Sequence, residues 1–209
     1  MGTEERRERE RSARYETIVA SARELFFAKG FATTTMDEIA QRAELSKGSL
    51  YLYFFSKEAL YATVMNEGLA ILFDRLEAAF RLDLPPDQML RRFGEVHYRY
   101  YVDYREYSRI FFFREHRDVT KLLPRELIRD NLEKGRRCFQ RIIEVIQEGI
   151  DKGIFAAIDP RQAAIAFWGA TNGILFLFED ELNKELFGLD VEPLFFYTID
   201  LFIEALKKR

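Results

Sequence analysis

Small polar side chains, hydroxyl groups and two lysines gather between residues 34 and 57 of this 209-residue chain. These residue types form no bond-breaking set, but hydroxyls, lysine ammonium groups and the free amides at a helix start all bind phosphate oxygens. The small residues of Ser46–Ser49 would also let the backbone approach base edges closely. We therefore predict a surface that contacts nucleic acid, with these candidate residues: Thr34, Thr35, Ser46, Lys47, Gly48, Ser49, Tyr51, Tyr53 and Lys57.

Two short helices joined by a tight turn are predicted to carry these residues. Thr35–Glu38 has the capping-box pattern, in which a threonine hydroxyl caps the amides of a new helix and a glutamate three residues later reaches back. The helix Met36–Ala43 then presents Ile39 and Ala40 to a core, and a second short helix covers Lys47–Tyr53. This pattern is typical of a helix-turn-helix, although an ordinary helical corner has the same spacing.

The rest of the chain also has helical periodicity, because apolar residues recur every three or four positions. We predict an all-α protein of about nine helices. The first helix runs from Arg14 to Lys29 and is stopped by Gly30 in a left-handed conformation. Further helices are expected at residues 57–81, 89–104, 124–150, 160–178 and 191–208, with a short aromatic helix at 109–113.

A charged arm precedes the first helix. Residues 4–11 hold four arginines and four glutamates, and the pairs Glu5–Arg9 and Arg6–Glu10 have the i,i+4 spacing of helical ion pairs. These pairs favour a solvated extension of the first helix over a basic arm that enters a minor groove.

Composition limits the classes to which the protein can belong. The formal net charge is −3, hydrophobic residues make up 48% of the chain, and Cys138 is its one cysteine. A lone cysteine makes neither an internal disulfide nor a thiolate metal cluster, and we predict no metal site and no cofactor. The longest uncharged run, Ala163–Phe178, is short for a membrane span, and the charged N-terminus does not resemble a signal peptide. We therefore expect a cytoplasmic protein with no membrane partner.

Three further segments, Ala22–Phe26, Lys29–Phe31 and Ser56–Leu60, flank the helix-turn-helix residues described above. With these segments, the stretch from Tyr15 to Leu60 resembles the DNA-binding domain of the TetR/AcrR family of bacterial repressors. Tyr53 stands where many members of that family carry histidine, and either side chain can reach a phosphate. The resemblance implies a homodimer, a palindromic double-stranded DNA operator, and a variable C-terminal domain that binds a small inducer. We accordingly expect a helix-turn-helix DNA-binding domain at residues 1–57 and a helical ligand-binding and dimerisation domain at residues 58–209. The matching segments, in the family's order and spacing, are Ala22–Phe26, Lys29–Phe31, Thr34–Ala40, Ser46–Tyr51, Tyr53–Phe54 and Ser56–Leu60.

Aromatic residues are dense in the C-terminal part of the chain. The three adjacent phenylalanines Phe111–Phe113 cannot all share one face of a helix, so some must line a second surface. Plain packing and a ligand cavity explain this density equally well, and a cavity of this kind would take an apolar or aromatic ligand. His97 and Asn172 are its candidate polar anchors, although His97 is more simply a buried core histidine. The candidate ligand-binding residues are Phe93, His97, Tyr100, Tyr101, Tyr104, Phe111, Phe139, Ile143, Phe167 and Asn172.

The segment Pro160–Phe178 is apolar on nearly all sides, so it needs cover from two directions. Its own domain supplies one side, and a second copy of the chain would supply the other. The helix Val191–Lys208 is the natural second member of this contact. The candidate dimer-interface residues are Trp168, Gly169, Gly173, Phe176, Phe195, Ile199 and Phe202.

Together these observations predict a ligand-responsive DNA-binding regulator, most simply a repressor that an inducer releases, without enzymatic activity. A helical enzyme is one alternative, but the sequence has no phosphate-binding glycine loop, no metal-ligand spacing and no arranged Ser–His–acid or Cys–His set. A structural helical oligomer is another alternative. It would explain the apolar C-terminal helices but not the detailed match from Tyr15 to Leu60.

Overall fold

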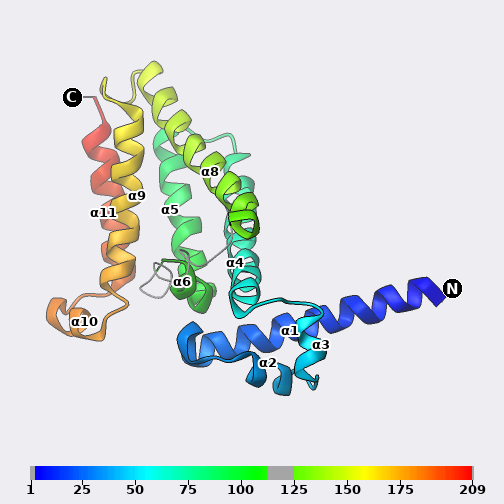
Figure 1. Cartoon of the computed structure of the whole chain (residues 1–209). Coiled ribbons are helices and arrows are strands. Elements are labelled where there is room, and N and C mark those ends of the chain that lie inside the picture. The colour runs from blue at the N-terminus through cyan, green and yellow to red at the C-terminus, as the bar shows by residue number, and fades with distance from the viewer. Residues whose placement is uncertain (1–2, 113–124, 209) are drawn as a thin grey trace. The chain divides into compact units, whose positions relative to one another are not determined.

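The structure is built from helices, as the sequence predicts. The computed structural model describes residues 3–112 and 125–208, and within these ranges it contains ten helices and no strand (Figure 1). The seven-residue helix α10 was not predicted, because it is short and buries none of its residues. Phe113 and Pro124, which the sequence places in helices, lie outside the described residues. The elements are α1 (Thr3–Thr33), α2 (Met36–Arg42), α3 (Lys47–Tyr51), α4 (Lys57–Phe80), α5 (Pro86–Asp103), α6 (Arg105–Phe112), α8 (Arg125–Asp151), α9 (Pro160–Leu177), α10 (Glu181–Phe187) and α11 (Val191–Leu206).

The helices form two compact units. The first unit takes the described residues of Met1–Gly68 and Arg109–Asp130, and the second unit takes those of Leu69–Ser108 and Asn131–Arg209. The domain boundary expected at residue 57 coincides with the start of α4, whereas the change of unit falls inside that helix, after Gly68. α4 therefore contributes residues to both units.

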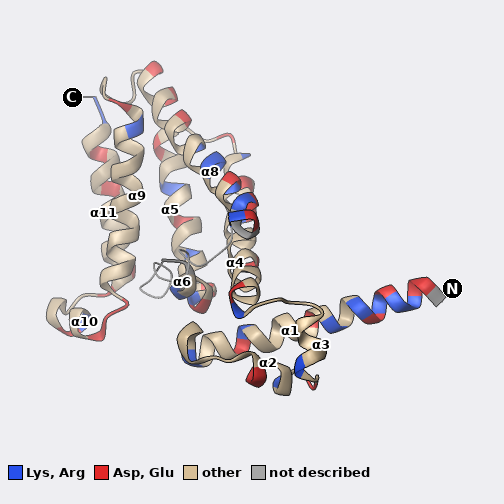
Figure 2. Cartoon of the chain, viewed as in Figure 1, with Lys and Arg blue, Asp and Glu red and all other residues tan. Residues whose placement is uncertain are grey.

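The charged arm is part of α1. Acidic and basic residues are interspersed along it (Figure 2), residues 4–17 are all exposed, and Arg6 Nε lies 2.9 Å from Glu10 Oε1. The prediction of a solvated helical extension is confirmed. At the other end, Gly30 has φ 80° and ψ 170°, a backbone conformation that essentially only glycine adopts. The predicted positive φ at Gly30 is therefore confirmed, and it kinks α1 rather than ending it.

Three helices and the start of α4 enclose the core of the first unit. Ile18 on α1, Ile39 on α2 and Leu50 on α3 are completely buried. The ring of Tyr61 on α4 meets the ring of Phe31 edge-to-face, with centroids 4.9 Å apart. Because α2 and α3 are too short to be stable alone, this shared core is what holds them in place.

The second unit packs α11 against both α5 and α9, which Figure 1 shows running side by side with it. Gly94 on α5 permits this approach, because a Cβ atom at that position would lie 2.1 Å from Ile199 Cδ1. The rings of Tyr98 and Phe195 pack with centroids 5.2 Å apart. The inner face of α11 thus packs against helices of the same chain.

The segment after α8 closes the end of the second unit. Phe155 is buried against Gly149, where a Cβ atom would lie 2.1 Å from the phenyl ring. Ala156 N donates to Leu206 O at 2.7 Å, which ties this segment to the end of α11.

Candidate nucleic-acid interface and helical domain

Thr35 caps the start of α2 in the predicted manner. Its Oγ1 accepts a hydrogen bond from Glu38 N at 3.3 Å, and Glu38 Oε2 accepts one from Thr35 N at 2.9 Å. The capping box is confirmed. Hydrogen bonds from Lys29 and Thr35 lower the pKa of Glu38 to about 2, so its carboxylate stays charged. This cap fixes the start of the helix on which α3 rests.

The five-residue helix α3 is held by its own cap and by one buried side chain. Ser46 Oγ accepts a hydrogen bond from Ser49 N at 3.1 Å, and Leu50 is completely buried. Ser46, Lys47 and Gly48 are exposed. A Cβ atom on Gly48 would meet Ser46 Oγ at an ordinary 3.9 Å. The first turn of α3 therefore presents small polar groups and free amides outward, which is how a recognition helix meets DNA.

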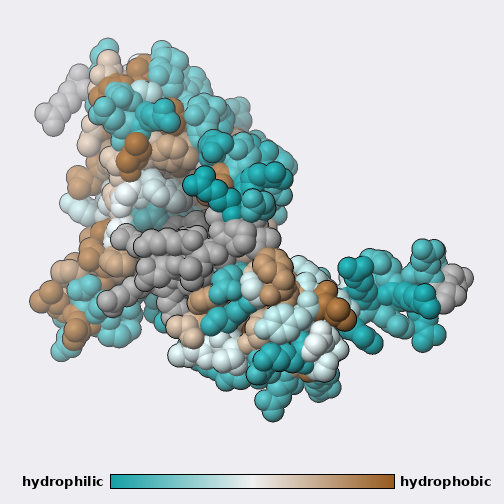
Figure 3. Space-filling view, in the orientation of Figure 1, coloured by the Kyte–Doolittle hydropathy of each residue, from teal (hydrophilic) through white to brown (hydrophobic). Residues whose placement is uncertain are grey.

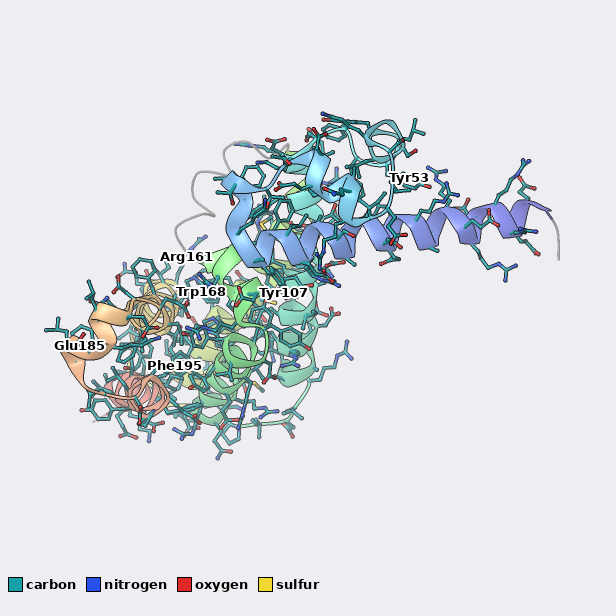
Figure 4. All side chains as sticks on the ribbon, turned by 90° about the horizontal axis from the view of Figure 1, so that it is seen from below. Tyr53, Tyr107, Arg161, Trp168, Glu185 and Phe195 are labelled. Carbon is teal, nitrogen blue, oxygen red and sulfur yellow. The ribbon has the colours of Figure 1, made fainter. Side chains whose placement is uncertain are left out.

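Lys47, Tyr51 and Tyr53 surround this turn. Lys47 Nζ lies 2.7 Å from Asp37 Oδ1, and this carboxylate raises the pKa of the lysine. Because an exposed ion pair is weak, the ammonium group can exchange Asp37 for a phosphate. Tyr51 is 45% exposed, and Tyr53 lies half-buried in the turn after α3 (Figure 4).

Two of the predicted contact residues are turned into the protein. Thr34 is completely buried and its Oγ1 donates to Gly30 O at 2.8 Å, so its side chain cannot contact DNA and this prediction is wrong. Lys57 Nζ donates to Phe31 O at 2.7 Å and to Thr34 O at 2.8 Å. It also lies 4.2 Å from the centroid of the Phe31 ring. The ammonium group of Lys57 thus stabilises the partial negative charge of the carbonyl oxygens at the end of α1. Its contact with phosphate stays a prediction that this geometry does not favour.

Leu52 is a candidate that sequence reasoning missed. It is the most exposed large apolar side chain of the described residues, at 84%, and directly follows α3. An apolar group there can contact sugars or a thymine methyl group. Its position between Tyr51 and Tyr53 was the available signal, because all three cannot face the core at once.

The predicted ligand-binding residues lie mainly in the interior of the second unit, where their role stays a prediction. His97 on α5 stacks on Trp168 of α9, with centroids 5.6 Å apart and an interplanar angle of 10°. Burial lowers the pKa of His97 to about 4, so its imidazole is neutral near pH 7. Phe93, His97, Tyr100, Tyr101 and Phe167 are buried, Tyr104, Phe139, Ile143 and Asn172 are half-buried, and the side chain of Phe111 is outside the described part.

Three buried side-chain oxygen atoms of the second unit have no hydrogen-bond partner among residues 3–112 and 125–208. They are Tyr100 Oη, Ser108 Oγ and Asn172 Oδ1. Asn172 still donates through Nδ2 to Trp168 O at 2.7 Å. Ser108 was not a predicted ligand-binding residue, because a helical serine usually satisfies its hydroxyl on its own backbone and the sequence gives no sign to the contrary.

The predicted dimer surface divides into inward-facing and outward-facing residues. Phe195 and Ile199 are completely buried within one chain, against Tyr98 and Gly94, so their prediction as interface residues is wrong (Figure 4). The apolar pattern of α11 did not reveal which of its two sides faces α5. Of the others, Gly169 and Phe176 are exposed, and Trp168, Gly173 and Phe202 are half-buried.

Outward-facing apolar residues that sequence reasoning missed lie on α9, α10 and α11. Hydrophobic side chains gather over α10 in particular (Figure 3), where Leu182 and Leu186 are three-quarters exposed. Besides Phe176, which was predicted, the large exposed apolar residues of these three helices are Ile165, Leu177, Leu182, Leu186, Phe187, Tyr197 and Leu201.

Other kinds of site find no support in the described ranges. No group of three or more potential metal ligands comes together there, and none of those helices combines the length and apolarity that crossing a membrane needs. Cys138 is buried, and burial raises the pKa of its thiol to about 11, so it is a poor nucleophile.

Comparison with known proteins agrees with this geometry. Residues 18–64 match the model of bacterial regulatory proteins of the tetR family, and residues 83–176 match the tetracyclin repressor-like C-terminal domain. The chain is 31% identical over 167 residues to the HTH-type transcriptional regulator RutR of Escherichia coli K12. The matched residues cover 79% of this chain and 76% of RutR.

Solved structures share the fold. The TetR family regulator PfmR from Thermus thermophilus matches with a TM-score of 0.70 and 25% identity, over 91% of this chain and 99% of that one. AibR, solved in complex with isovaleryl coenzyme A and operator DNA, matches with a TM-score of 0.68 and 21% identity, over 93% and 98% of the two chains. The chain therefore belongs to the TetR family of bacterial transcriptional regulators, which are DNA-binding proteins rather than enzymes.

Proposed function

We propose that the protein is a repressor that binds a palindromic operator as a homodimer and is released by a small, mainly apolar or aromatic ligand. Residues 1–57 bind DNA in this proposal, residues 58–209 bind the ligand and form the dimer, and the protein works in the cytoplasm. The observation that carries the proposal is the capped and exposed first turn of α3, which presents Ser46–Ser49 outward.

Each α3 enters the major groove of one half-site. Its first turn contacts bases or phosphates through Ser46–Ser49, and Thr35, Tyr51 and Tyr53 hold the DNA backbone. The exposure of Lys47 and Tyr51 supports these roles. Phosphate contacts affect all sequences alike, whereas base contacts set the preferred sequence, so the two kinds are separable by experiment.

The second copy of the chain covers the outward sides of α9 and α11. The exposed side chains of Ile165 and Phe176 on α9, and of Tyr197 and Leu201 on α11, support this assignment. Gly169 lies on the same helix as the first pair, and a Cβ atom there would meet nothing within 4 Å in the described part of one chain. A two-fold dimer presents two copies of α3, and this is why its operator is palindromic.

The ligand acts by preferring a state in which the two copies of α3 are spaced wrongly for the operator. The buried aromatic residues of α5 and α9 supply apolar area for its binding. The fold shared with AibR, whose structure holds both a small molecule and operator DNA, supports a ligand site in the same chain as the DNA-binding domain. The coupling is reciprocal, so operator DNA weakens ligand binding by the factor by which the ligand weakens DNA binding.

Selection from genomic DNA at a fixed salt concentration tests the proposal, because it measures specific binding and returns the operator. The purified protein is compared with Gly48→Glu, which places a negative charge on the first turn of α3 where a side chain has room. We expect the wild-type protein to enrich fragments that share an inverted repeat and the variant to enrich none. Wild-type fragments without a shared sequence, or the same repeat recovered by both proteins, would refute the proposal.

A further inference from the structure

The hydroxyl groups of Tyr100 and Ser108 are buried where the described chain gives them nothing to bind. Both residues are completely buried, and neither Tyr100 Oη nor Ser108 Oγ has a hydrogen-bond partner in the ranges 3–112 and 125–208. Such groups are few in native proteins, because a buried polar atom without a partner lowers stability. A bound molecule that supplies the missing partner is a common reason for their presence.

The two hydroxyls lie on one face of the α5–α6 segment. Tyr104 N donates to Tyr100 O, and Ser108 N donates to Tyr104 O, both at 2.9 Å. The i→i−4 bonds thus continue through the break at Tyr104, and the three side chains stand one above another. The rings of Tyr100 and Tyr104 are stacked, with centroids 5.6 Å apart. This face belongs entirely to the second unit.

Comparable hydroxyls in this chain do have partners. Four helical threonines donate to the carbonyl oxygen four residues earlier, at 2.8–3.0 Å: Thr17, Thr63, Thr171 and Thr198. The phenols that neighbour Tyr100 are also engaged, since Tyr101 Oη donates to Glu179 and Tyr104 Oη accepts from Arg75 Nη2 at 3.2 Å. Tyr100 and Ser108 are exceptions to this pattern. Tyr100 is the stronger one, because a phenol cannot reach its own backbone.

The charges around this face favour an oxygen acceptor as the missing partner. A cation beside this face is Arg75, whose guanidinium lies 4.7 Å from the centroid of the Tyr104 ring and is paired with Asp103 at 3.0 Å. Burial raises the pKa of Tyr100, so its hydroxyl keeps its proton and can donate it. A hydroxyl can donate or accept a hydrogen bond, but a neighbouring arginine disfavours a cationic ligand, so a carbonyl or carboxylate oxygen suits this face better than an ammonium group.

We propose that Tyr100 Oη donates a hydrogen bond to a carbonyl-type oxygen of an otherwise apolar ligand, with Ser108 Oγ as a second donor about two helical turns along the same segment, and that these hydroxyls determine which lipophilic molecules the protein accepts. This inference rests on the ligand-binding part of the proposed function and adds a chemical class to it. Aromatic rings supply most of the contact area, and the two hydroxyls select molecules that carry the oxygen.

A matched pair of probes tests the proposal. 4-Phenylbutan-2-one and butylbenzene have the same carbon skeleton and differ by one carbonyl oxygen. Their dissociation constants are measured by ligand-detected NMR with the full-length wild-type protein and with two variants. Tyr100→Phe removes the hydroxyl in question, and Tyr98→Phe makes the same change on the same helix, where the hydroxyl lies beside the carboxylate of Glu192.

We expect the wild-type protein and Tyr98→Phe to bind the ketone roughly tenfold more tightly than the hydrocarbon, because one net hydrogen bond is worth about that factor. Tyr100→Phe should bind the two probes about equally. Without ligand, Tyr100→Phe should unfold at the same temperature as the wild type or a higher one, whereas Tyr98→Phe should unfold at a lower one.

Three results would overturn the proposal. The wild-type protein could bind the ketone no better than the hydrocarbon. The preference could survive in Tyr100→Phe. The ligand-free Tyr100→Phe variant could unfold at a lower temperature, which would mean that water or another group already satisfies the hydroxyl. Operator binding by the same samples separates this proposal from the proposed function, because specific DNA binding without a ketone preference refutes only the present one.

Discussion

Hydroxyl groups have hydrogen-bond partners in one region of this protein and lack them in another region. Around α2 and α3, the hydroxyls of Thr35 and Ser46 accept hydrogen bonds from backbone amides three residues later, which fixes the short helices that bear the exposed surface. On the face of α5 and α6, the hydroxyls of Tyr100 and Ser108 are buried without a partner among the described residues. The proposed DNA-reading surface is thus made rigid by satisfying its polar groups locally, and the proposed ligand site is marked by polar groups that the described chain leaves unsatisfied.

The largest effect is expected from a charge on the outward side of α9, because the proposed operator is symmetric and takes two copies of the first region. Phe176→Asp should give a monomer by sedimentation velocity and weaken operator binding by roughly a hundredfold or more, since the second α3 no longer binds as a tethered partner. Phe176 is 55% exposed in one chain.

Leu132→Asp on α8 is the matched control, because Leu132 is 56% exposed and lies outside the proposed interface. This variant should remain dimeric and bind the operator normally. A dimeric Phe176→Asp protein with unchanged affinity would show that the two copies meet elsewhere.

Two lysines of the first region should respond differently to removal. Lys57→Ala should lower the free energy of unfolding by about 1.5–3 kcal/mol, because its ammonium bonds buried carbonyls at the end of α1. Lys47→Ala should leave the free energy of unfolding nearly unchanged, because its ion pair is exposed. It should instead reduce the salt dependence of operator binding by roughly one unit of slope.

Urea unfolding and operator titrations from low to high salt measure both quantities. A Lys57→Ala protein of unchanged stability, whose operator binding depends less steeply on salt, would support the phosphate contact that the sequence predicts for Lys57.

The smallest effect concerns the pH dependence of the capping box. The pKa of Glu38 is lowered to about 2 in the folded state, so its contribution to stability is present above the ordinary carboxyl pKa of about 4.5. That contribution is lost as the pH falls from 4.5 towards 2. In Glu38→Gln the decline in unfolding free energy between pH 5 and pH 3 should be smaller than in the wild type. An equal decline, measured by urea unfolding at the two pH values, would mean that the hydrogen bonds of Glu38 do not persist in solution.

The sequence predicts the local features of the first region well. Thr35 and Glu38 form their capping box, and Gly30 takes its positive φ, because each depends on residues within a few positions along the chain. Thr34 was misjudged although its hydrogen bond is also local, because the sequence does not show that its side chain is buried, and Lys57 makes contacts that are distant along the chain. Both bind carbonyls at the end of α1, and no spacing rule connects Lys57 to Phe31, 26 residues earlier.

The second region is less predictable, because its side chains are sorted by packing between distant helices. Phe195 and Ile199 belong to the same apolar pattern as the outward-facing residues of α11, and only the approach of α5 at Gly94 turns them inward. Tyr100 was predicted as a wall residue from its aromatic ring, but its unsatisfied hydroxyl became visible only once its neighbours were placed. The same is true of Ser108.

The central claim is that two symmetric copies of the α2–α3 surface hold one operator. A hydroxyl-radical footprint on the selected DNA fragment tests it most directly, because it reports which phosphates and sugars the protein covers. We expect two protected patches related by two-fold symmetry, with centres about one helical turn apart or a multiple of it, and both lost together in Gly48→Glu. A single protected patch, or protection that persists in Gly48→Glu, would contradict the account.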